Sequence, residues 1–145
     1  MKRKIGIFTT HPIQYQVPLF KSLERVKNID THIFYASNHG MKPKMDKGFN
    51  KKFAWDIDLV SGYKYKFIGS NKNDVNNFFL NSNKIKKEIL QGKFNASIVF
   101  GWNNIYYLKS IFYSFFYSKK LILRAENNFL KKENNLKKLL KKIFF

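Results

Sequence analysis

The chain contains no cysteine among its 145 residues. This absence excludes a disulfide framework, a metal site built from thiolates and a cysteine nucleophile. The three histidines, His11, His32 and His39, lack the spacing of metal ligands, so we expect neither a metal nor a cofactor. Because hydrophobic residues make up 44% of the sequence and aromatic residues 18%, the chain is apolar enough to fold around one sizeable core.

A long hydrophobic run is also missing. The apolar residues near the N-terminus extend only from Ile5 to Phe8, which is too short for the core of a secretory signal. The longest apolar stretch, from Ile105 to Tyr117, is interrupted by Lys109 and is shorter than the ~20 residues of a membrane span. We therefore expect a cytoplasmic protein, with any membrane contact peripheral and confined to the inner face.

Acidic residues are scarce. Nine Asp and Glu stand against 28 Lys and Arg, which gives a net charge of +19, and such a charge is compatible with nucleic-acid binding. However, 25 of the basic residues are lysine and only 3 are arginine. Phosphate and base recognition favours the forked arginine side chain, whereas an A/T-rich genome enriches Lys, Asn, Ile and Phe whatever the partner. We therefore disfavour nucleic acid as a partner.

Short runs typical of β-strands alternate with helical patterns along the chain. Residues 17–26, for example, carry apolar side chains at helical spacing, whereas residues 63–68 alternate at a period of two. This alternation predicts an α/β fold with a Rossmann-like parallel sheet and helices on both faces. We expect strands at 4–9, 31–36, 63–68, 96–100 and 120–124, and helices at 17–26, 78–90 and 103–117.

Three of these strands contain stretches that are almost entirely apolar, at 5–8, 98–100 and 121–123, as is typical of central strands in a parallel sheet. The segment 37–62 departs from the alternation because 26 residues separate the second strand from the third. Connections of this length are usually functional or disordered. Since this one contains aromatic and acidic residues, we expect an ordered, functional loop.

The connection after the first strand is the most informative. Ligands of parallel α/β sheets bind at the carboxyl ends of the strands, and His11, Gln14 and Tyr15 follow the first strand directly. Pro12 and Pro18 stiffen this connection and discourage an earlier helix start. These side chains are candidates for a binding site, and His11 is a candidate catalytic base, as are Asp46 and Glu126 further along the chain. A polar turn with a proline at the helix entry explains His11 equally well.

Two further candidate groups lie in the segment 37–62. Gly48 permits a tight bend between Asp46, which can bond sugar hydroxyls or backbone amides, and Phe49, which can anchor the loop. Trp55 and Asp56 fit a sugar-binding pair, with an aromatic face beside a hydroxyl acceptor. An ordinary surface turn, and a tryptophan that holds the loop on the core, are the structural alternatives.

The last candidates follow the fourth and fifth strands. Trp102 and Asn103 come after the fourth strand, where Asn103 or Asn104 can also cap the next helix. The amino terminus of that helix would favour an anionic ligand group. Arg124 and Glu126 follow the fifth strand, and they either pair with each other or bind a ligand.

Seven segments, in order, resemble a bacterial group of family-4-like glycosyltransferases. The similarity extends from about Lys4 to Asn127. Such enzymes have the GT-B architecture, in which two Rossmann-like domains face a cleft. The matching segments are HPIQYQVPLF (11–20), FYAS (34–37), DKGF (46–49), FAWD (53–56), GY leading to Phe67 (62–67), FGWN (100–103) and LRAE (123–126).

The resemblance implies that residues 1–128 form the N-terminal, acceptor-binding domain of a glycosyltransferase. Its substrates would be a nucleotide sugar and a glycan or lipid-linked acceptor, and the C-terminal donor domain would be missing from this chain. Where many members have a glycine pair near the donor phosphates, this chain has Thr9, Thr10, His11 and Pro12. Because the donor domain would be missing, we expect no activity from the chain alone. The alternative is a stand-alone α/β module that binds a ligand or partner without catalysis.

Residues 129–145 predict a basic amphipathic helix that ends without a cap, as in a fragment. One interpretation packs its apolar stripe on the sheet and leaves the lysines in water. The other docks the helix on an anionic membrane surface, where each lysine contributes ~1 kcal/mol.

Overall fold

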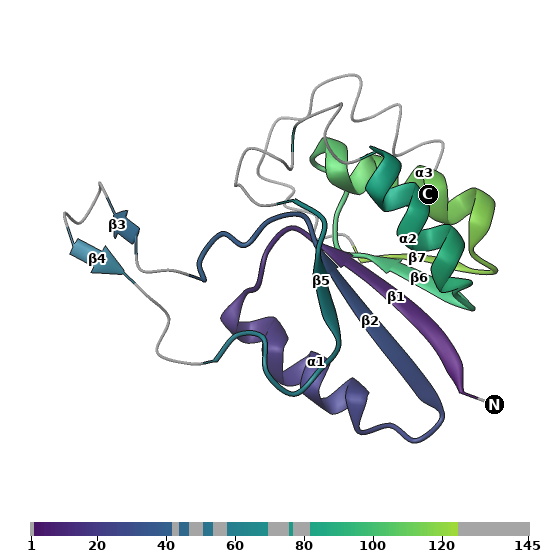
Figure 1. Cartoon of the computed structure of the whole chain (residues 1–145), viewed down its shortest axis with the longest axis horizontal. Coiled ribbons are helices and arrows are strands. Elements are labelled where there is room, and N and C mark those ends of the chain that lie inside the picture. The colour runs from purple at the N-terminus through teal and green to yellow at the C-terminus, as the bar shows by residue number, and fades with distance from the viewer. Residues whose placement is uncertain are drawn as a thin grey trace.

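The computed structural model describes residues 2–41, 44–46, 51–53, 58–69, 76 and 82–124. Within them, five strands form one parallel sheet in the order β5-β2-β1-β6-β7 (Figure 1). The predicted α/β class is confirmed, because an all-parallel sheet covered by helices is consistent with a Rossmann-like fold. The strands are β1 (Arg3–Thr9), β2 (Ile29–Tyr35), β5 (Tyr65–Phe67), β6 (Ala96–Val99) and β7 (Leu121–Leu123).

Helices cover both faces of the sheet, as predicted. A short 3-10 helix, η1 (Gln14–Gln16), leads into α1 (Val17–Glu24) on one face, while α2 (Ser82–Gly92) and α3 (Ile105–Tyr117) lie side by side on the other (Figure 1). Neighbouring residues of β1 face opposite ways, since Ile7 packs in the cluster with α1 and Phe8 in the cluster with α2 and α3. This period of two explains why Ile7 and Phe8 are both apolar although they are neighbours in β1: each face of the sheet needs its own core.

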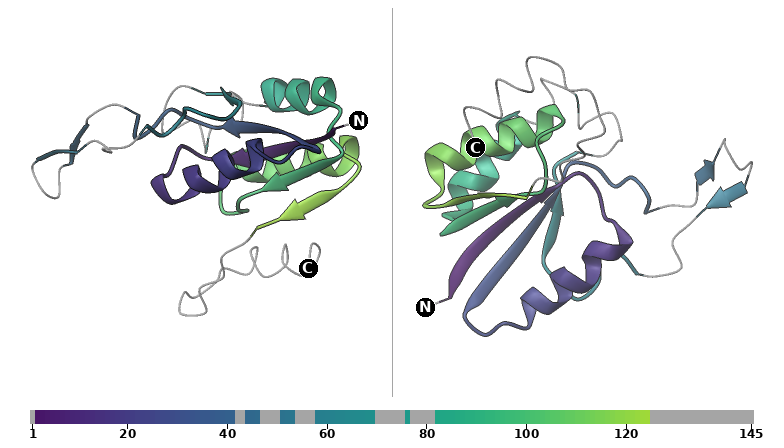
Figure 2. Two further views of the ribbon diagram at one scale, coloured as in Figure 1. Left: turned by 90° about the horizontal axis from the view of Figure 1, so that it is seen from below. Right: turned by 180° about the vertical axis from the view of Figure 1, so that it is seen from behind.

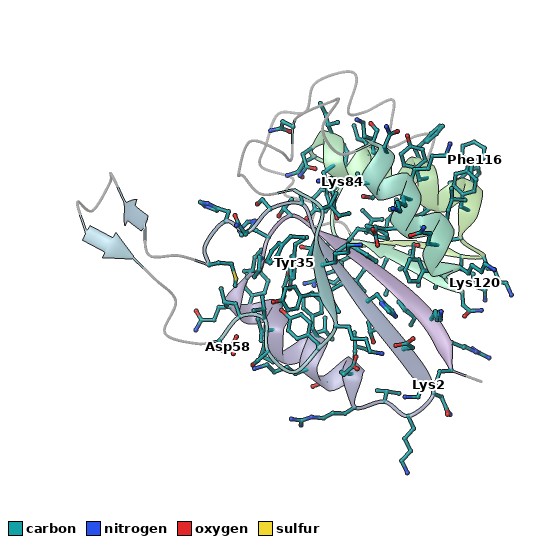
Figure 3. All side chains as sticks on the ribbon, viewed as in Figure 1. Lys2, Tyr35, Asp58, Lys84, Phe116 and Lys120 are labelled. Atoms are coloured by element: carbon teal, nitrogen blue, oxygen red, sulfur yellow. The ribbon has the colours of Figure 1, made fainter. Side chains whose placement is uncertain are left out.

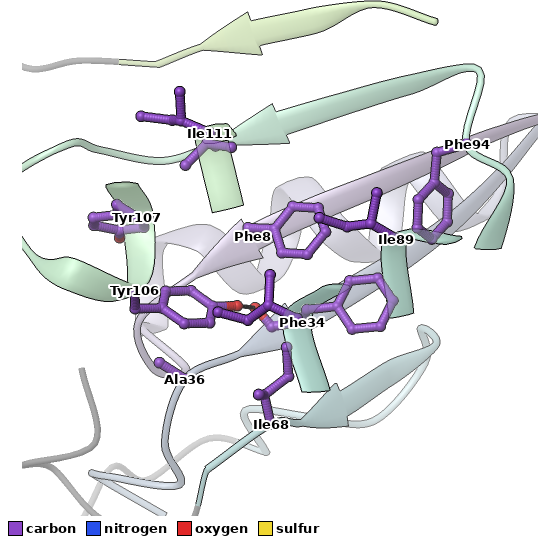
Figure 4. Close-up of a cluster of buried hydrophobic side chains, with 11 residues drawn as sticks. Phe8, Phe34, Ala36, Ile68, Ile89, Phe94, Tyr106, Tyr107 and Ile111 are labelled. Atoms are coloured by element: carbon purple, nitrogen blue, oxygen red, sulfur yellow. Dashed lines mark hydrogen bonds between the residues drawn. The ribbon is translucent and has the colours of Figure 1, made fainter. Parts of the chain in front are cut away.

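The core beneath α2 and α3 is built around stacked aromatic rings (Figure 4). The rings of Phe8 and Phe34 are stacked with centroids 5.0 Å apart, and Phe94 meets Phe34 edge-on at 5.8 Å. Gly6 makes room for Phe94, because a Cβ at this glycine would lie 2.9 Å from the Phe94 ring. The buried Tyr106 hydroxyl donates to the Phe34 carbonyl at 2.9 Å, which satisfies its polar atom inside the core.

The core beneath α1 contains a buried pair of tyrosines. Tyr35 is fully buried, and its hydroxyl lies 2.7 Å from that of Tyr63, which in turn donates to the Leu59 carbonyl. Burial raises the pKa of Tyr35 and of Tyr63 above the usual tyrosine value. The pair therefore fastens the segment that leads into β5 onto the end of β2 (Figure 3, where Tyr35 and Asp58 are labelled).

Helix boundaries follow local chemistry. Pro18 lies in the first turn of α1, where no backbone donor is required. Asn104 caps α3, since its side chain accepts a hydrogen bond from the Tyr107 amide at 2.9 Å. Of the two caps predicted from sequence, Asn104 is therefore confirmed. No helix in the described part of the chain is long and apolar enough to cross a membrane.

The described part of the segment 37–62 contains two short strands, β3 (Lys44–Asp46) and β4 (Lys51–Phe53), which pair antiparallel away from the main sheet (Figure 2). One expectation needs correction. β7 is not a central strand: it is the last strand of the described sheet, and Ile122 is 49% exposed. Its apolar character has a different cause, since Leu121 and Leu123 pack against the core beneath α2 and α3. The predicted helix at 129–145 lies outside the described residues.

Candidate functional site

The carboxyl ends of the five strands meet at one edge of the sheet. Hydrogen bonds continue past the strands, so the connecting segments leave the sheet in register. This geometry places the residues that follow β1, β2, β6 and β7 next to one another, as expected for a parallel sheet. The bonds run from Ile68 N to Tyr35 O (2.8 Å), Ala36 N to Thr9 O (3.1 Å), Phe100 N to Phe8 O (3.0 Å) and Arg124 N to Val99 O (2.9 Å).

His11 lies at this edge, two residues beyond β1. Its Nδ1 atom is 3.0 Å from the Thr10 hydroxyl, and its ring meets the ring of His39 at a centroid distance of 5.5 Å. The second connection is tied to the first because the Ser37 amide donates to the Thr10 carbonyl at 2.9 Å. Two imidazole rings, each from the connection after one of two neighbouring strands, therefore lie next to each other at the carboxyl edge.

The other predicted residues of the first connection differ in exposure. Gln14 is half-buried, whereas Tyr15 is 65% exposed. Gln16 is buried and accepts a hydrogen bond from the Thr9 hydroxyl at 3.4 Å. Gln16 thus fixes η1 to the end of β1, and leaves Tyr15 at the surface with its ring available to a ligand.

The connection after β6 brings an aromatic ring to the same edge. Gly101 has a φ of 151°, and a Cβ there would lie 2.6 Å from the Tyr107 ring, so only glycine fits this close approach. Trp102, the next residue, is half-buried and packs on the edge of the core beneath α2 and α3. Asn103 is exposed and accepts from the Asn104 side chain at 3.3 Å.

Cationic groups gather at the same end of the sheet. The Arg124 guanidinium lies 4.9 Å from the centre of the Phe100 ring, a cation–π arrangement that positions the charge beyond β6 and β7. At the start of α2, Lys84 donates to the Ile68 carbonyl at 3.2 Å. Lys109, whose pKa is lowered by burial, donates to the Ser82 hydroxyl. These charges, with the amino termini of α2 and α3, bias the described edge toward anionic ligands.

Several predicted site residues cannot be placed in this arrangement. Five of them lie outside the described residues: Gly48, Phe49, Trp55, Asp56 and Glu126. Asp46 is placed by its backbone alone, as the last residue of β3. Their proposed roles remain predictions.

Residues that the sequence interpretation passed over also belong to the edge. His39 follows β2 as His11 follows β1, so the rule that selected His11 also selects His39. Phe100 was interpreted as the end of a strand, yet its ring supports Arg124 and contacts Phe20 at 5.9 Å. Within the described residues, no group of three or more His, Cys, Asp and Glu side chains is arranged to hold a metal ion.

A cavity of about 330 Å³ lies elsewhere, beside β5 and α2 toward the amino ends of the strands. Its charged side chains are largely paired. Lys66 donates to Glu88 at 2.6 Å, and Asp30 accepts from Lys64 and lies 3.2 Å from His32 Nε2. The Lys64 bond holds the pKa of Asp30 below its usual value. Because these charges neutralise one another, the carboxyl edge is the stronger candidate site.

No protein-family model, no curated protein and no solved structure matches this chain. The glycosyltransferase resemblance therefore rests on the seven sequence segments, and the fold on the structure itself.

Proposed function

We propose that this domain binds the acceptor in a glycosyltransferase that moves a sugar from a nucleotide sugar to a glycan or lipid-linked acceptor. The observation that carries the proposal is the convergence of His11, Trp102 and Arg124 at the carboxyl edge of one parallel sheet. These three residues come from three of the segments that resemble the family. Their chemistry suits acceptor binding, because they supply an imidazole base, an aromatic ring for a sugar face and a cation for a phosphate.

In an inverting transfer, a base removes the proton from the acceptor hydroxyl as its oxygen attacks the anomeric carbon, and the nucleoside diphosphate leaves. His11 is the described residue best suited to this role. When Thr10 accepts the Nδ1 proton at 3.0 Å, Nε2 is the basic nitrogen of the neutral ring. We propose that a second domain holds the donor, since transfer requires both substrates in one cleft.

The cationic edge suits an acceptor that carries phosphate, such as a lipid diphosphate-linked sugar. This acceptor would place the protein at the inner face of a membrane. The second candidate function, a ligand-binding module without catalysis, is supported by the fold, because a single α/β domain is sufficient to bind a ligand.

Calorimetric titration with a short-chain polyprenyl diphosphate-linked sugar tests the proposal. We expect the chain to bind this acceptor, and Arg124→Gln to weaken the binding at least roughly tenfold, the lower end of the range for a hydrogen bond to a charged group. Arg25→Gln is the matched control, since Arg25 is also exposed but lies at the end of α1. No binding of the acceptor, or equal effects of the two substitutions, would contradict the proposal. Binding of the acceptor without transfer in a complete two-domain protein would favour the non-catalytic module.

A further inference from the structure

Helix α3 has two apolar faces. Its inner face is buried against the sheet. Its opposite side, here called the outer face, contains Leu108, Phe112, Phe115 and Phe116, and these side chains are 36%, 57%, 66% and 62% exposed. A helix on the surface of a globular domain normally presents polar residues to water, so the outer face is unusual.

The exposed rings form one cluster. Phe116 lies 4.9 Å from Phe112 and 5.4 Å from Phe115, measured between ring centroids. Phe116 is at the periphery of the molecule, on the far side of α3 from the sheet (Figure 3). Contiguous apolar surface of this kind marks an interaction site, whereas single exposed apolar residues do not.

The segment that contains α3 is strongly basic. Residues 82–124 contain eight Lys and Arg but only one acid, Glu88, and Glu88 bonds Lys66 at 2.6 Å. The exposed Lys119 and Lys120 follow the carboxyl end of α3 after Ser118. The outer face and these two lysines therefore fit a partner that is apolar within and anionic at its rim.

We propose that the outer face of α3 docks on an anionic phospholipid bilayer. The phenylalanine rings enter the boundary between headgroups and acyl chains, and Lys119 and Lys120 meet the lipid phosphates. With 13 residues, α3 lies in the plane of the interface rather than across it.

A second copy of the chain fits this surface less well. Pairing two outer faces would bring their flanking lysines together, and each chain carries a net charge of +19, so repulsion opposes self-association. This proposal adds a docking surface to the membrane location proposed above, and it is argued from α3 and the two lysines that follow it. Its test contains no sugar substrate, so its failure is distinguishable from failure of the proposed transferase function.

Co-sedimentation of the full chain with vesicles of phosphatidylglycerol and phosphatidylcholine tests the proposal. Each lysine near an anionic surface strengthens binding about fivefold, so Lys119→Gln with Lys120→Gln should weaken it ~25-fold. The combined change Phe112→Ser, Phe115→Ser and Phe116→Ser should weaken binding at least roughly tenfold, because it removes the inserted apolar surface.

Matched changes on the α1 side provide the controls. Arg25→Gln with Lys27→Gln removes the same charge, and Leu19→Ser removes an exposed apolar side chain. These controls should bind as the wild type does, and circular dichroism should show that every variant folds. If the lysine variant and the phenylalanine variant both bind vesicles as the wild type does, another surface contacts the membrane and the proposal is overturned. A dimer in light scattering that the phenylalanine changes dissolve, with no binding to vesicles, would assign the outer face to a second copy.

Discussion

Tyr63→Phe is expected to destabilise the fold more than Tyr35→Phe, although both changes remove a single hydroxyl. The Tyr35 hydroxyl is fully buried and bonds the Tyr63 hydroxyl at 2.7 Å, and Tyr63 also donates to Leu59. Tyr35→Phe removes one hydrogen bond and leaves the bond to Leu59 in place. Tyr63→Phe removes both bonds and leaves the Tyr35 hydroxyl buried without this partner.

The magnitudes follow from this difference. One buried hydrogen bond contributes about 1 kcal/mol, whereas a buried polar group left without a partner costs about 1–3 kcal/mol. We therefore expect a loss in the free energy of unfolding of about 1 kcal/mol for Tyr35→Phe and about 2–4 kcal/mol for Tyr63→Phe. The double variant should be more stable than Tyr63→Phe alone, since it removes the stranded hydroxyl.

Urea denaturation at neutral pH, followed by circular dichroism, measures these differences when the slope of the transition is unchanged. The two single variants and the double variant form a double-mutant cycle. A smaller loss for Tyr63→Phe than for Tyr35→Phe would refute this reasoning. Additive losses in the double variant would refute it as well.

Three further predictions concern ionisation and helix capping. Burial raises the pKa of Tyr35 and Tyr63, so their contribution to the stability of the fold is complete below about pH 10 and is lost as the pH rises further. Alkaline titration followed by circular dichroism should show this loss of stability, and a loss already complete near neutrality would contradict the prediction. Asn104→Ala should lower the free energy of unfolding by about 1 kcal/mol through loss of the α3 cap, measured by urea denaturation, and no change would exclude the cap. Lys64→Gln should raise the pKa of Asp30, because the hydrogen bond from Lys64 is the main cause of its depressed value. The stability that Asp30 contributes is present above the pKa of Asp30 in the unfolded chain and is lost as the pH falls through its pKa in the folded protein. An Asp30 pKa that NMR titration finds unchanged in the variant would refute the bond.

The parallel sheet was predictable because its signals are local. The apolar run that contains Ile7 and Phe8 supplies both cores, and spacing alone indicates the helical stripe of α1 and a cap at Asn103 or Asn104, between which the structure selects Asn104. The position of β7 was not predictable, since an apolar strand needs packing partners but does not reveal its neighbours in the sheet. The β3–β4 pair escaped prediction because each strand has only 3 residues, too few to show a period of two.

The candidate site was predictable in part for a similar reason. The rule that ligands bind where parallel strands end located His11, Trp102 and Arg124 without a structure. It did not reveal the contact between His11 and His39, because that contact depends on the path of the connection after β2. Nor did it reveal that the Phe100 ring supports Arg124, which depends on the three-dimensional register of β6 and β7.

NMR titration of the labelled chain with the polyprenyl diphosphate-linked sugar tests the central claim most directly. The acceptor should shift the amide signals of residues 10–11, 13–16, 36–40, 100–104 and 124, which belong to the carboxyl edge. A nucleotide sugar at the same concentration should leave these signals in place. Shifts confined to the opposite cavity, around His32 and Lys64, or a response to the nucleotide sugar alone, would contradict the assignment of this domain to the acceptor.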